Sequence, residues 1–526
     1  MDEKFADFEC KRCGKCCRKH GTVRLNDAEV NAIADFLKME VPAFTDQYTD
    51  LLPDRSGLTL TEFENGDCIF FREGAGCLIN PVKPKQCRDF PYYWNFPGWE
   101  EVCEGGKAMM KRGRQSNDEE KSETITYIRR RKEEMTTYPK IYLGLDNCVA
   151  SKRWCEPAHW MNLCEKCGVY YVEASADNEI DPLYTTADYL DDWAAAVLAD
   201  ANKTGVKVAN LYSGHGTYAT LGLAHPDVRV RNRIHHDWLD RMVDLAAKMN
   251  AGLGFFCHAF DQATLNDPAR YAFAYNDLTE RLAALAAYAA EKKLDSIGVE
   301  QMDTPHQVPW TVANAGQLLK DCYAKNGKDF YLTIDTGHQS GQRKFAAKDD
   351  AATIAAFNSI REKGRAEGIY LGSAAAERAI VSGALNGVSD AALLEIVKED
   401  RITNHWLWSE DADGDTYRWL EQLGTWSPIV HLQQTDGKSS AHQPFSEKCN
   451  ATGIIRGEKV LQAIKAAYDK PVAAGMPAPC KSIVLTLEVF AGTADLTCDI
   501  ENKIIDSVRY WRQFIPEDGM TLDQLV

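Results

Sequence analysis

Eight short apolar runs recur along the chain after Tyr138, and they limit the fold more than any other feature. Alanine-rich stretches with helical periodicity, such as DLTERLAALAAYAAEKK, separate them. The runs are KIYLGLD, GVYYVEASAD, VKVANLYSG, GLGFFCHAF, SIGVEQMD, FYLTIDTGH, PIVHLQQTD and SIVLTLEVF. Strands that alternate with amphipathic helices predict βα units with parallel pairing. Eight such units predict a closed (β/α)8 TIM barrel of the α/β class.

The length of the chain indicates more than this one domain. At 526 residues the chain exceeds the size at which a single hydrophobic core usually stops growing. We place a small, irregular, cysteine-rich domain at 1–107, a charged and helical linker at 108–137, and the barrel at 138–526. The interval from Asp335 to His431 is far longer than one helix. It predicts a long helical insertion between the sixth and seventh barrel strands.

Four polar residues occupy the ends of consecutive runs in the second half of the chain. Glu300 ends the fifth run, Asp335 ends the sixth, His431 lies in the seventh, and Glu488 ends the eighth. Because TIM barrels place their chemistry at the carboxyl ends of the strands, we expect these side chains to converge. Three carboxylates and one imidazole suit a divalent cation such as Mn2+, Mg2+, Co2+ or Zn2+.

Further polar and aromatic residues follow the runs and are candidates for contacts with a substrate. Each of them could instead serve as a capping, hydrogen-bonded or packed residue, and Glu173 could also orient a metal ligand. The candidates are His338, His258, His215, Glu173, His306 and Trp310.

The segments GVEQMD, TIDTGH, VHLQQTD and LTLEVF, in this order, resemble the xylose isomerase-like TIM barrel superfamily. That superfamily contains sugar isomerases and epimerases, including the D-tagatose 3-epimerase group. The resemblance implies that Glu300, Asp335, His431 and Glu488 bind the metal and that His338 contacts a substrate oxygen. The long insertion and the tract HLQQTDGKSSAHQPF depart from a minimal member of the superfamily.

The same residues suggest a chemistry without reference to a family. A divalent cation that binds a carbonyl and the adjacent hydroxyl stabilises an enediolate, and Glu300 and Glu488 could move the proton. This predicts a sugar or sugar-phosphate isomerase or epimerase. Three alternatives stay open: an endonuclease IV-like metal-dependent phosphodiesterase, a decarboxylase or lyase with the same enediolate chemistry, and an inactive barrel within a metal-binding or redox-sensing protein.

The N-terminal region concentrates thiols, because eight of the 17 cysteines precede residue 104. They are Cys10, Cys13, Cys16, Cys17, Cys68, Cys77, Cys87 and Cys103. In a chain without an export signal, such density predicts metal binding rather than disulfides. CxxCxxCC, followed by C-x8-C and KPKQCRDFP, resembles the cysteine-cluster family of zinc- or iron-chelating domains. Two four-coordinate ions or one cluster with spare thiols are both compatible with eight cysteines, and His20 could replace one thiol.

The composition of the chain limits the classes of partner that it is expected to bind. The net charge of −17 argues against a nucleic-acid surface, which usually carries a basic field. No apolar run is long enough for a transmembrane helix, so we expect a cytoplasmic protein that does not bind a membrane. The expected partner is a small sugar or sugar phosphate. Association into a homo-oligomer is compatible with such a barrel, and the sequence identifies no interface.

Overall fold

The computed structural model describes residues 10–526 apart from 12, 19–20, 53–56, 92–98, 106, 109–137, 151–152, 214–221 and 258–259. The chain divides into two compact units, 1–136 and 137–526, and each is described by itself. The predicted linker at 108–137 lies outside the described residues except for its first residue.

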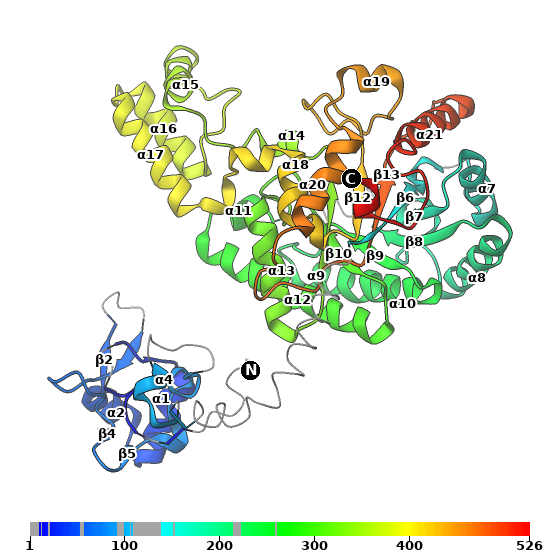
Figure 1. Cartoon of the computed structure of the whole chain (residues 1–526). Coiled ribbons are helices and arrows are strands. Elements are labelled where there is room, and N and C mark those ends of the chain that lie inside the picture. The colour runs from blue at the N-terminus through cyan, green and yellow to red at the C-terminus, as the bar shows by residue number, and fades with distance from the viewer. Residues whose placement is uncertain are drawn as a thin grey trace. The chain divides into compact units, whose positions relative to one another are not determined.

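The larger unit is a closed barrel of parallel strands (Figure 1). Where the structure describes the chain, eight strands follow one another around the barrel in chain order, and β13 pairs with β6 to close it. They are β6 (Lys140–Asp146), β7 (Tyr171–Ser175), β8 (Lys207–Tyr212), β9 (Gly252–Phe255), β10 (Ile297–Glu300), β11 (Tyr331–Asp335), β12 (Ile429–Leu432) and β13 (Ser482–Leu487). Each strand falls within one of the predicted apolar runs, and the predicted fold class is confirmed.

Burial on both faces explains why these strands are continuous apolar runs. Every residue of β9, β10 and β12 is buried, because side chains fill the barrel inside and helices cover it outside. A short strand, β14 (Met520–Thr521), pairs antiparallel with the first two residues of β6. It occupies the edge of β6 that β7 leaves open, since β7 begins to pair only at Gly144.

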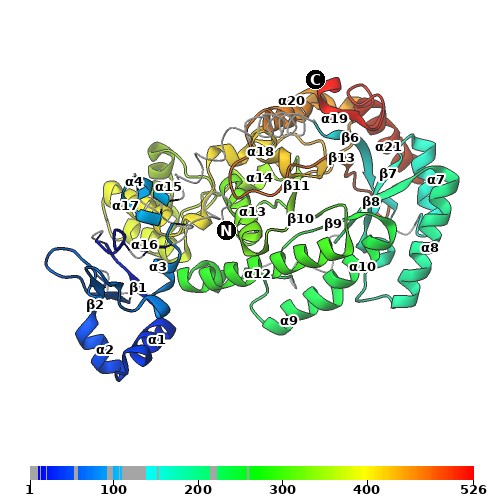
Figure 2. The ribbon, with the colours of Figure 1, turned by 60° about the horizontal axis from the view of Figure 1, so that its bottom comes forward.

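Helices form the outer layer of the barrel (Figures 1 and 2). Asp267 begins the longest of them by accepting hydrogen bonds from the main-chain N–H groups of Ala269 and Arg270, and Pro268 takes the first helical position. The helices are α7 (Pro157–Cys167), α8 (Ala187–Thr204), α9 (Val228–Arg233), α10 (Asp240–Met249), α11 (Gln262–Leu265), α12 (Pro268–Lys292), α13 (Val312–Asn326), α20 (Gly457–Tyr468), α21 (Thr497–Trp511) and α22 (Leu522–Leu525).

The predicted insertion between β11 and β12 is helical. It contains α14 (Gln339–Gln342), α15 (Asp350–Lys363), α16 (Ala374–Leu385), α17 (Asp390–Thr403) and α18 (Thr416–Leu423). Helices α15 to α17 surround a small core of their own and stand at the edge of the barrel unit in both views (Figures 1 and 2). A further helix, α19 (Glu447–Thr452), lies in the long loop after β12.

The smaller unit has little regular structure. Its elements are β1 (Arg24–Leu25), α1 (Asp27–Leu37), α2 (Val41–Tyr48), β2 (Thr49–Leu51), β3 (Leu58–Leu60), β4 (Phe71–Arg72), β5 (Gly76–Cys77), α3 (Lys85–Arg88) and α4 (Trp99–Val102). The strands form one sheet in the order β1-β3-β2 and one hairpin of β4 and β5. Ile33, Phe44 and Phe70 lie in its apolar core, which is small for a domain of this length.

None of the helices that the structure describes has both the length and the apolarity needed to cross a bilayer.

Candidate functional site

The strand register brings the polar strand ends of the barrel together. Asp335 of β11 stands directly beside His431 of β12, and Asp146 of β6 stands beside Glu173 of β7. Glu488 follows the last residue of β13. All five side chains are buried, and all but Glu173, which is central in β7, lie in the last two positions of a strand or directly after it. The mouth of the barrel therefore holds a dense group of carboxylates around one imidazole.

Three of the four predicted metal ligands lie close enough to hold one ion. Glu300, Asp335 and His431 each offer one ligand atom, and these atoms lie within 4.8 Å of one another. The fourth, Glu488, places Oε2 at 3.6 Å from Nδ1 of His431. The structure thus brings the four predicted residues into one place, and their binding of a metal stays a prediction.

His431 is held between two carboxylates. Its Nδ1 lies 3.1 Å from Oε1 of Glu300, and its Nε2 lies 2.6 Å from Oε2 of Glu173. Asn210 donates a hydrogen bond of 2.5 Å to the other oxygen of Glu173. Glu173 therefore orients the imidazole from behind, which leaves Nδ1 as the nitrogen that faces the other carboxylates.

The predicted substrate residue His338 faces the same group. Its Nδ1 lies 2.8 Å from the carbonyl oxygen of Gln301. Because a carbonyl oxygen only accepts, Nδ1 carries the proton of this hydrogen bond. The other ring nitrogen, Nε2, lies 3.9 Å from Oδ1 of Asp335. His338 thus presents Nε2 to the mouth of the barrel.

Burial and crowding change the acidity of the carboxyl groups. Burial opposes the charge on Asp335, yet His338, His442 and His431 hold the pKa of its carboxyl well below the usual value. Burial raises the pKa of Glu488 well above its usual value, and the charge on Asp335 adds to that rise. Neighbouring carboxylates thus differ strongly in their affinity for a proton, which is typical of a functional site.

The surrounding carboxylates raise the pKa of two histidines in the site. Burial opposes protonation of His431, but the surrounding glutamates, led by Glu173, raise its pKa well above the usual value. Burial also opposes protonation of His338, and Asp335 and Glu300 raise its pKa to about 9. Negative charge therefore dominates the mouth of the barrel, and a bound cation would relieve it.

Besides Asp146, three further residues outside the predicted set belong to this site. Tyr212, the last residue of β8, donates a hydrogen bond from its hydroxyl to Oε2 of Glu300. His442 stacks on Phe490 with ring centroids 3.8 Å apart, and its Nε2 lies 3.4 Å from Oε2 of Glu488. Gln433 donates to the carboxylate of Asp335. Tyr212 could have been found by considering every polar strand end, not only acids and histidines.

The remaining predicted substrate residues have other surroundings. Nδ1 of His306 lies 2.6 Å from the carbonyl oxygen of Phe260. Trp310 is buried, donates from its indole to the carbonyl oxygen of Trp406 and packs edge-on against Phe345. Both have the contacts of structural residues, and their contact with a substrate stays a prediction. His215 and His258 lie outside the described residues.

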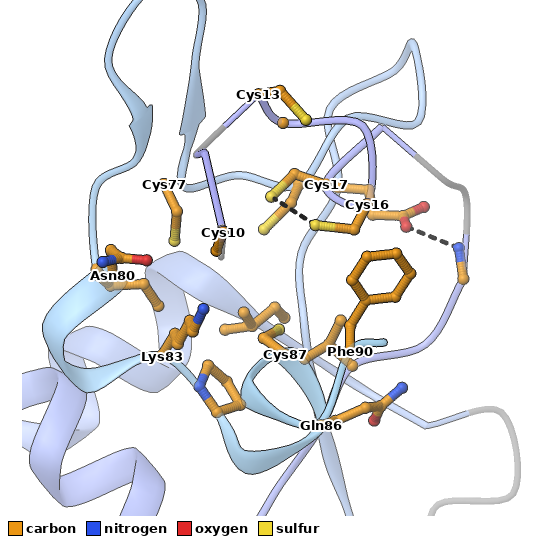
Figure 3. A pocket seen from close by; sticks show the side chains of 18 of the residues that line it. Cys10, Cys13, Cys16, Cys17, Cys77, Asn80, Lys83, Gln86, Cys87 and Phe90 are labelled. Atoms are coloured by element: carbon orange, nitrogen blue, oxygen red, sulfur yellow. Dashed lines mark hydrogen bonds between the residues drawn. The ribbon is translucent and has the colours of Figure 1, made fainter. Parts of the chain in front are cut away.

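The eight N-terminal cysteines all line one cavity of about 220 Å³ (Figure 3). They come from the CxxCxxCC segment and from four positions between Cys68 and Cys103. Lys83 and Phe90 line the same cavity. The irregular fold of the smaller unit thus gathers thiols that are far apart in the sequence. His20 lies outside the described residues.

The thiols surround the cavity and do not converge on one point. The Sγ atoms of Cys13 and Cys103 are 3.9 Å apart, and those of Cys16 and Cys17 are 4.0 Å apart. Among the described residues, the groups of three metal-capable side chains within 4.8 Å all lie in the barrel unit. The N-terminal cavity therefore has room for a centre larger than one ion.

Lys83 supplies a positive charge to this cavity. The hydrogen bond with Cys17 lowers the pKa of Cys16 to about 7, and the Lys83 ammonium acts in the same direction. Burial raises the pKa of Cys87 to about 12, and Lys83 opposes that rise. Figure 3 shows the Lys83 amine between Cys77 and Cys87.

Two family models match parts of this chain. Residues 161–363 match the family described as "Xylose isomerase-like TIM barrel". Residues 9–104 match the CxxCxxCC family, described as "Putative zinc- or iron-chelating domain". The chain thus combines a xylose isomerase-like TIM barrel with an N-terminal CxxCxxCC domain, as the two sequence resemblances predict.

Two solved structures illustrate what this chain is similar to. One is the crystal structure of a "Putative Xylose isomerase" from Rhodospirillum rubrum ATCC 11170, with a TM-score of 0.51 and 19% identity over 71% of this chain and 99% of that chain. Another is D-psicose 3-epimerase with D-tagatose from Clostridium cellulolyticum H10, with a TM-score of 0.41 and 11% identity over 71% of this chain and 98% of that chain. At this identity the first likeness supports the fold alone.

Proposed function

We propose that the barrel is a divalent-cation-dependent isomerase or epimerase of a sugar or sugar phosphate. One observation carries this proposal: ligand atoms of Glu300, Asp335 and His431 lie within 4.8 Å of one another. Oε2 of Glu488 lies 3.6 Å from Nδ1 of the same histidine. The family match to a xylose isomerase-like barrel supports it.

The donor set fits a hard or borderline divalent cation. Carboxylate oxygens and one imidazole suit Mn2+, Mg2+, Co2+ or Zn2+ better than the softer ions that thiolates select. Glu300, Asp335, His431 and Glu488 would hold the ion, and Glu173 would fix the imidazole from behind. When bound, such a cation supplies the positive charge that stabilises an enediolate next to a sugar carbonyl.

Glu300 and Glu488 would move the proton. They approach Nδ1 of His431 from β10 and from the end of β13, which β11 and β12 separate. One carboxylate would remove a proton from the substrate carbon, and the other would return it to the opposite face, which gives epimerisation. Transfer between adjacent carbons would give isomerisation.

His338 and His442 would contact substrate oxygens. Both point a ring nitrogen toward the carboxylates of the site, and hydrogen bonds or stacking hold both rings. Imidazole groups in these positions can hold a hydroxyl group of the substrate by hydrogen bonds. Trp310 and His306 are not needed for this role.

The test combines metal content with a substrate panel. Full-length protein and a Glu300→Gln/Glu488→Gln variant are analysed for Mn2+ bound per chain and then assayed on ketoses, their phosphates and a DNA with an abasic site. We expect the variant to lose one bound Mn2+ and all ketose turnover. Glu179→Gln is the matched control, because Glu179 is half-buried in the segment after β7 and accepts from Trp160 and Trp193 instead of from the site.

Two outcomes would contradict the proposal. Equal Mn2+ content in wild type and the double variant would show that the strand-end carboxylates do not bind the ion. Cleavage of the DNA with no turnover of any sugar would favour the phosphodiesterase alternative.

We also propose that the N-terminal domain binds zinc or iron through its thiolates. The wide spacing of the eight cysteines around one cavity supports a centre of more than one ion, either two separate ions or one cluster. Metal analysis after purification without oxygen tests this. Iron with an equal amount of acid-labile sulfide would indicate a cluster, two zinc ions would indicate separate sites, and protein with neither metal would contradict the proposal.

A further inference from the structure

A group of side chains that can bind a metal lies on the helix that follows β8. Ligand atoms of His235, His236 and Asp240 lie within 4.8 Å of one another. The two histidines belong to a π-helical turn, η5 (Ile234–Leu239), and Asp240 is the first residue of α10. This turn joins α9 to α10 in the outer layer of the barrel (Figure 2). The proposed sugar chemistry uses none of these three residues.

The π-helical turn brings the three side chains to one face of the helix. The main-chain N–H of Asp240 donates to the carbonyl oxygen of His235, so this hydrogen bond spans five residues instead of four. In a regular α-helix, residues five apart point about 140° away from each other. The wider turn returns Asp240 to the side of His235, and His236 is its neighbour four positions earlier. Such turns within α-helices are frequent at functional sites.

The distances among the three side chains suit a small divalent cation. Nε2 of His235 lies 3.8 Å from Oδ1 of Asp240, and Nδ1 of His236 lies 2.9 Å from Oδ2 of Asp240. Two atoms that bind one tetrahedral zinc ion at about 2.1 Å lie about 3.4 Å apart. Small rotations of the side chains would therefore place all three around one ion. Two imidazoles and one carboxylate suit zinc and leave its fourth position for water.

His235 lacks the hydrogen bonds that a buried imidazole usually makes. Only 9% of its side chain is exposed, and its Nδ1 has no hydrogen-bond partner among the residues that the structure describes. Its Nε2 is too far from Asp240 for a hydrogen bond. Burial of polar atoms without partners is unfavourable. A metal ion on Nε2 would supply an interaction at the nitrogen that faces Asp240.

The carboxylate of Asp240 has no competing cation in the described part of the chain. Its two oxygens have the two histidines as partners, and neither oxygen pairs with a lysine or arginine there. The guanidinium of Arg281, which also acts on His235, lies 2.8 Å from Asp277. The charges of that pair largely offset each other. A cation between Asp240 and the two imidazoles is therefore compatible with its surroundings.

We propose that His235, His236 and Asp240 form a zinc site that clamps the π-helical turn between α9 and α10. Because all three ligands come from one segment of helix, the bound ion stabilises this segment against local opening. The inference is independent of the sugar chemistry proposed for the mouth of the barrel.

Peptide-resolved hydrogen exchange of the full chain tests this site. Amides of residues 228–249 report it separately from the thiol cavity, which also binds zinc in our proposal. Exchange is compared without Zn2+ and with free Zn2+ raised to about 100 µM, and about tenfold slowing is expected at ten times Kd. The slowing should be absent in His236→Gln and in Asp240→Asn. Comparing each variant with and without Zn2+ cancels the stability lost with the His236–Asp240 contact.

Two control variants keep the three ligands. Asp237→Asn removes another carboxylate of the same turn, which pairs with Arg233 at 3.8 Å. Glu300→Gln/Glu488→Gln removes carboxylates from the mouth of the barrel. Both controls should show the full slowing, so a failure of the proposed function would leave this result unchanged.

Each result has one meaning. No slowing in wild type, or equal slowing in wild type and His236→Gln, would overturn the inference. Loss of slowing in Asp237→Asn would indicate a general effect of charge, and loss in the double variant would trace it to the barrel mouth. Either would also overturn the inference. If Asp240→Asn does not fold, His236→Gln decides alone, because 62% of that side chain is exposed.

Discussion

Glu173 and His431 form a buried pair in which Oε2 of the glutamate lies 2.6 Å from Nε2 of the histidine. The two residues are 258 positions apart in the chain, on β7 and β12. A carboxylate behind an imidazole sets which ring nitrogen carries a proton and directs the other toward the site. The pair therefore joins β7 to β12 and fixes the direction in which Nδ1 of His431 points.

Replacing Glu173 by Gln should weaken metal binding in the barrel. The amide cannot supply the negative charge behind His431, and loss of such a partner lowers metal affinity by about 10–100-fold. Mn2+ titration of the full chain measures the change. Glu179→Gln should bind Mn2+ as wild type does, because Glu179 bonds to Trp160 and Trp193. Equal affinity in Glu173→Gln and wild type would exclude an orienting role.

Replacing Tyr212 by Phe should slow turnover and leave Mn2+ bound. The hydroxyl of Tyr212 donates to Oε2 of Glu300, and loss of a hydrogen bond to a charged group costs about 1.5 kcal/mol, or about tenfold in rate. Steady-state kinetics on the best ketose would show a lower kcat. Tyr275→Phe removes a half-buried hydroxyl that bonds to Asp321 between α12 and α13, and its kcat should not change. A normal kcat in Tyr212→Phe would contradict the prediction.

Replacing Lys83 by Met should weaken metal binding in the N-terminal cavity. The ammonium group stabilises negative charge on Cys16, Cys77 and Cys87, and its removal should cost about 1–2 kcal/mol, or about tenfold in affinity. Co2+ titration reports this site through the thiolate charge-transfer band, which oxygen and nitrogen ligands do not produce.

Lys85→Met is the control for this variant. The Lys85 ammonium pairs with Asp89 at 2.5 Å on the surface, so its loss should not affect Co2+ affinity. Equal weakening by both substitutions would indicate a general effect of net charge, and no weakening by Lys83→Met would show that its charge is irrelevant.

Replacing Asp400 by Asn should destabilise the helical insertion. The buried carboxylate of Asp400 accepts from the main chain and hydroxyl of Ser373, from Asn404 and from the indole of Trp408. The asparagine side chain would place its NH2 group against one or more of these donors. This should lower the free energy of unfolding of the insertion by about 1–3 kcal/mol. Hydrogen exchange of α16 and α17 should accelerate.

Asp390→Asn provides the comparison, because Asp390 is only partly covered and pairs with Arg361 at 2.6 Å. Loss of an exposed ion pair should cost under about 1 kcal/mol. Similar exchange rates in the two variants would show that the Asp400 bonds do not hold the insertion together.

The barrel could be predicted because its signal is local and repeated. Each strand is a run such as FYLTIDTGH whose burial on both faces appears directly as consecutive apolar residues. The order of the runs then places the carboxyl ends of the strands at one mouth. Glu300, Asp335, His431 and Glu488 could be selected for this reason, since strand topology alone brings them together.

Loop residues of the site could not be selected in this way. His442 lies eleven positions after His431, and only the return of the loop stacks it on Phe490 beside Glu488. Gln433 belongs to a strand end, but its hydrogen bonds depend on Ser440 and His442, which the loop folds back toward it. Such contacts depend on the path of a loop, which leaves no periodic pattern of apolar residues in the sequence.

The amino-acid sequence by itself determined the number of barrel strands, the acidic and histidine residues at their ends, and the concentration of thiols before residue 104. These features follow from local periodicity and spacing, which do not depend on distant contacts. Only the tertiary structure decided that Glu173 lies behind His431, that the Gln433 amide lies beside Asp335, and that eight thiols line one cavity. Those relations join residues that are distant in the chain, and packing and hydrogen bonding select them once the chain is compact.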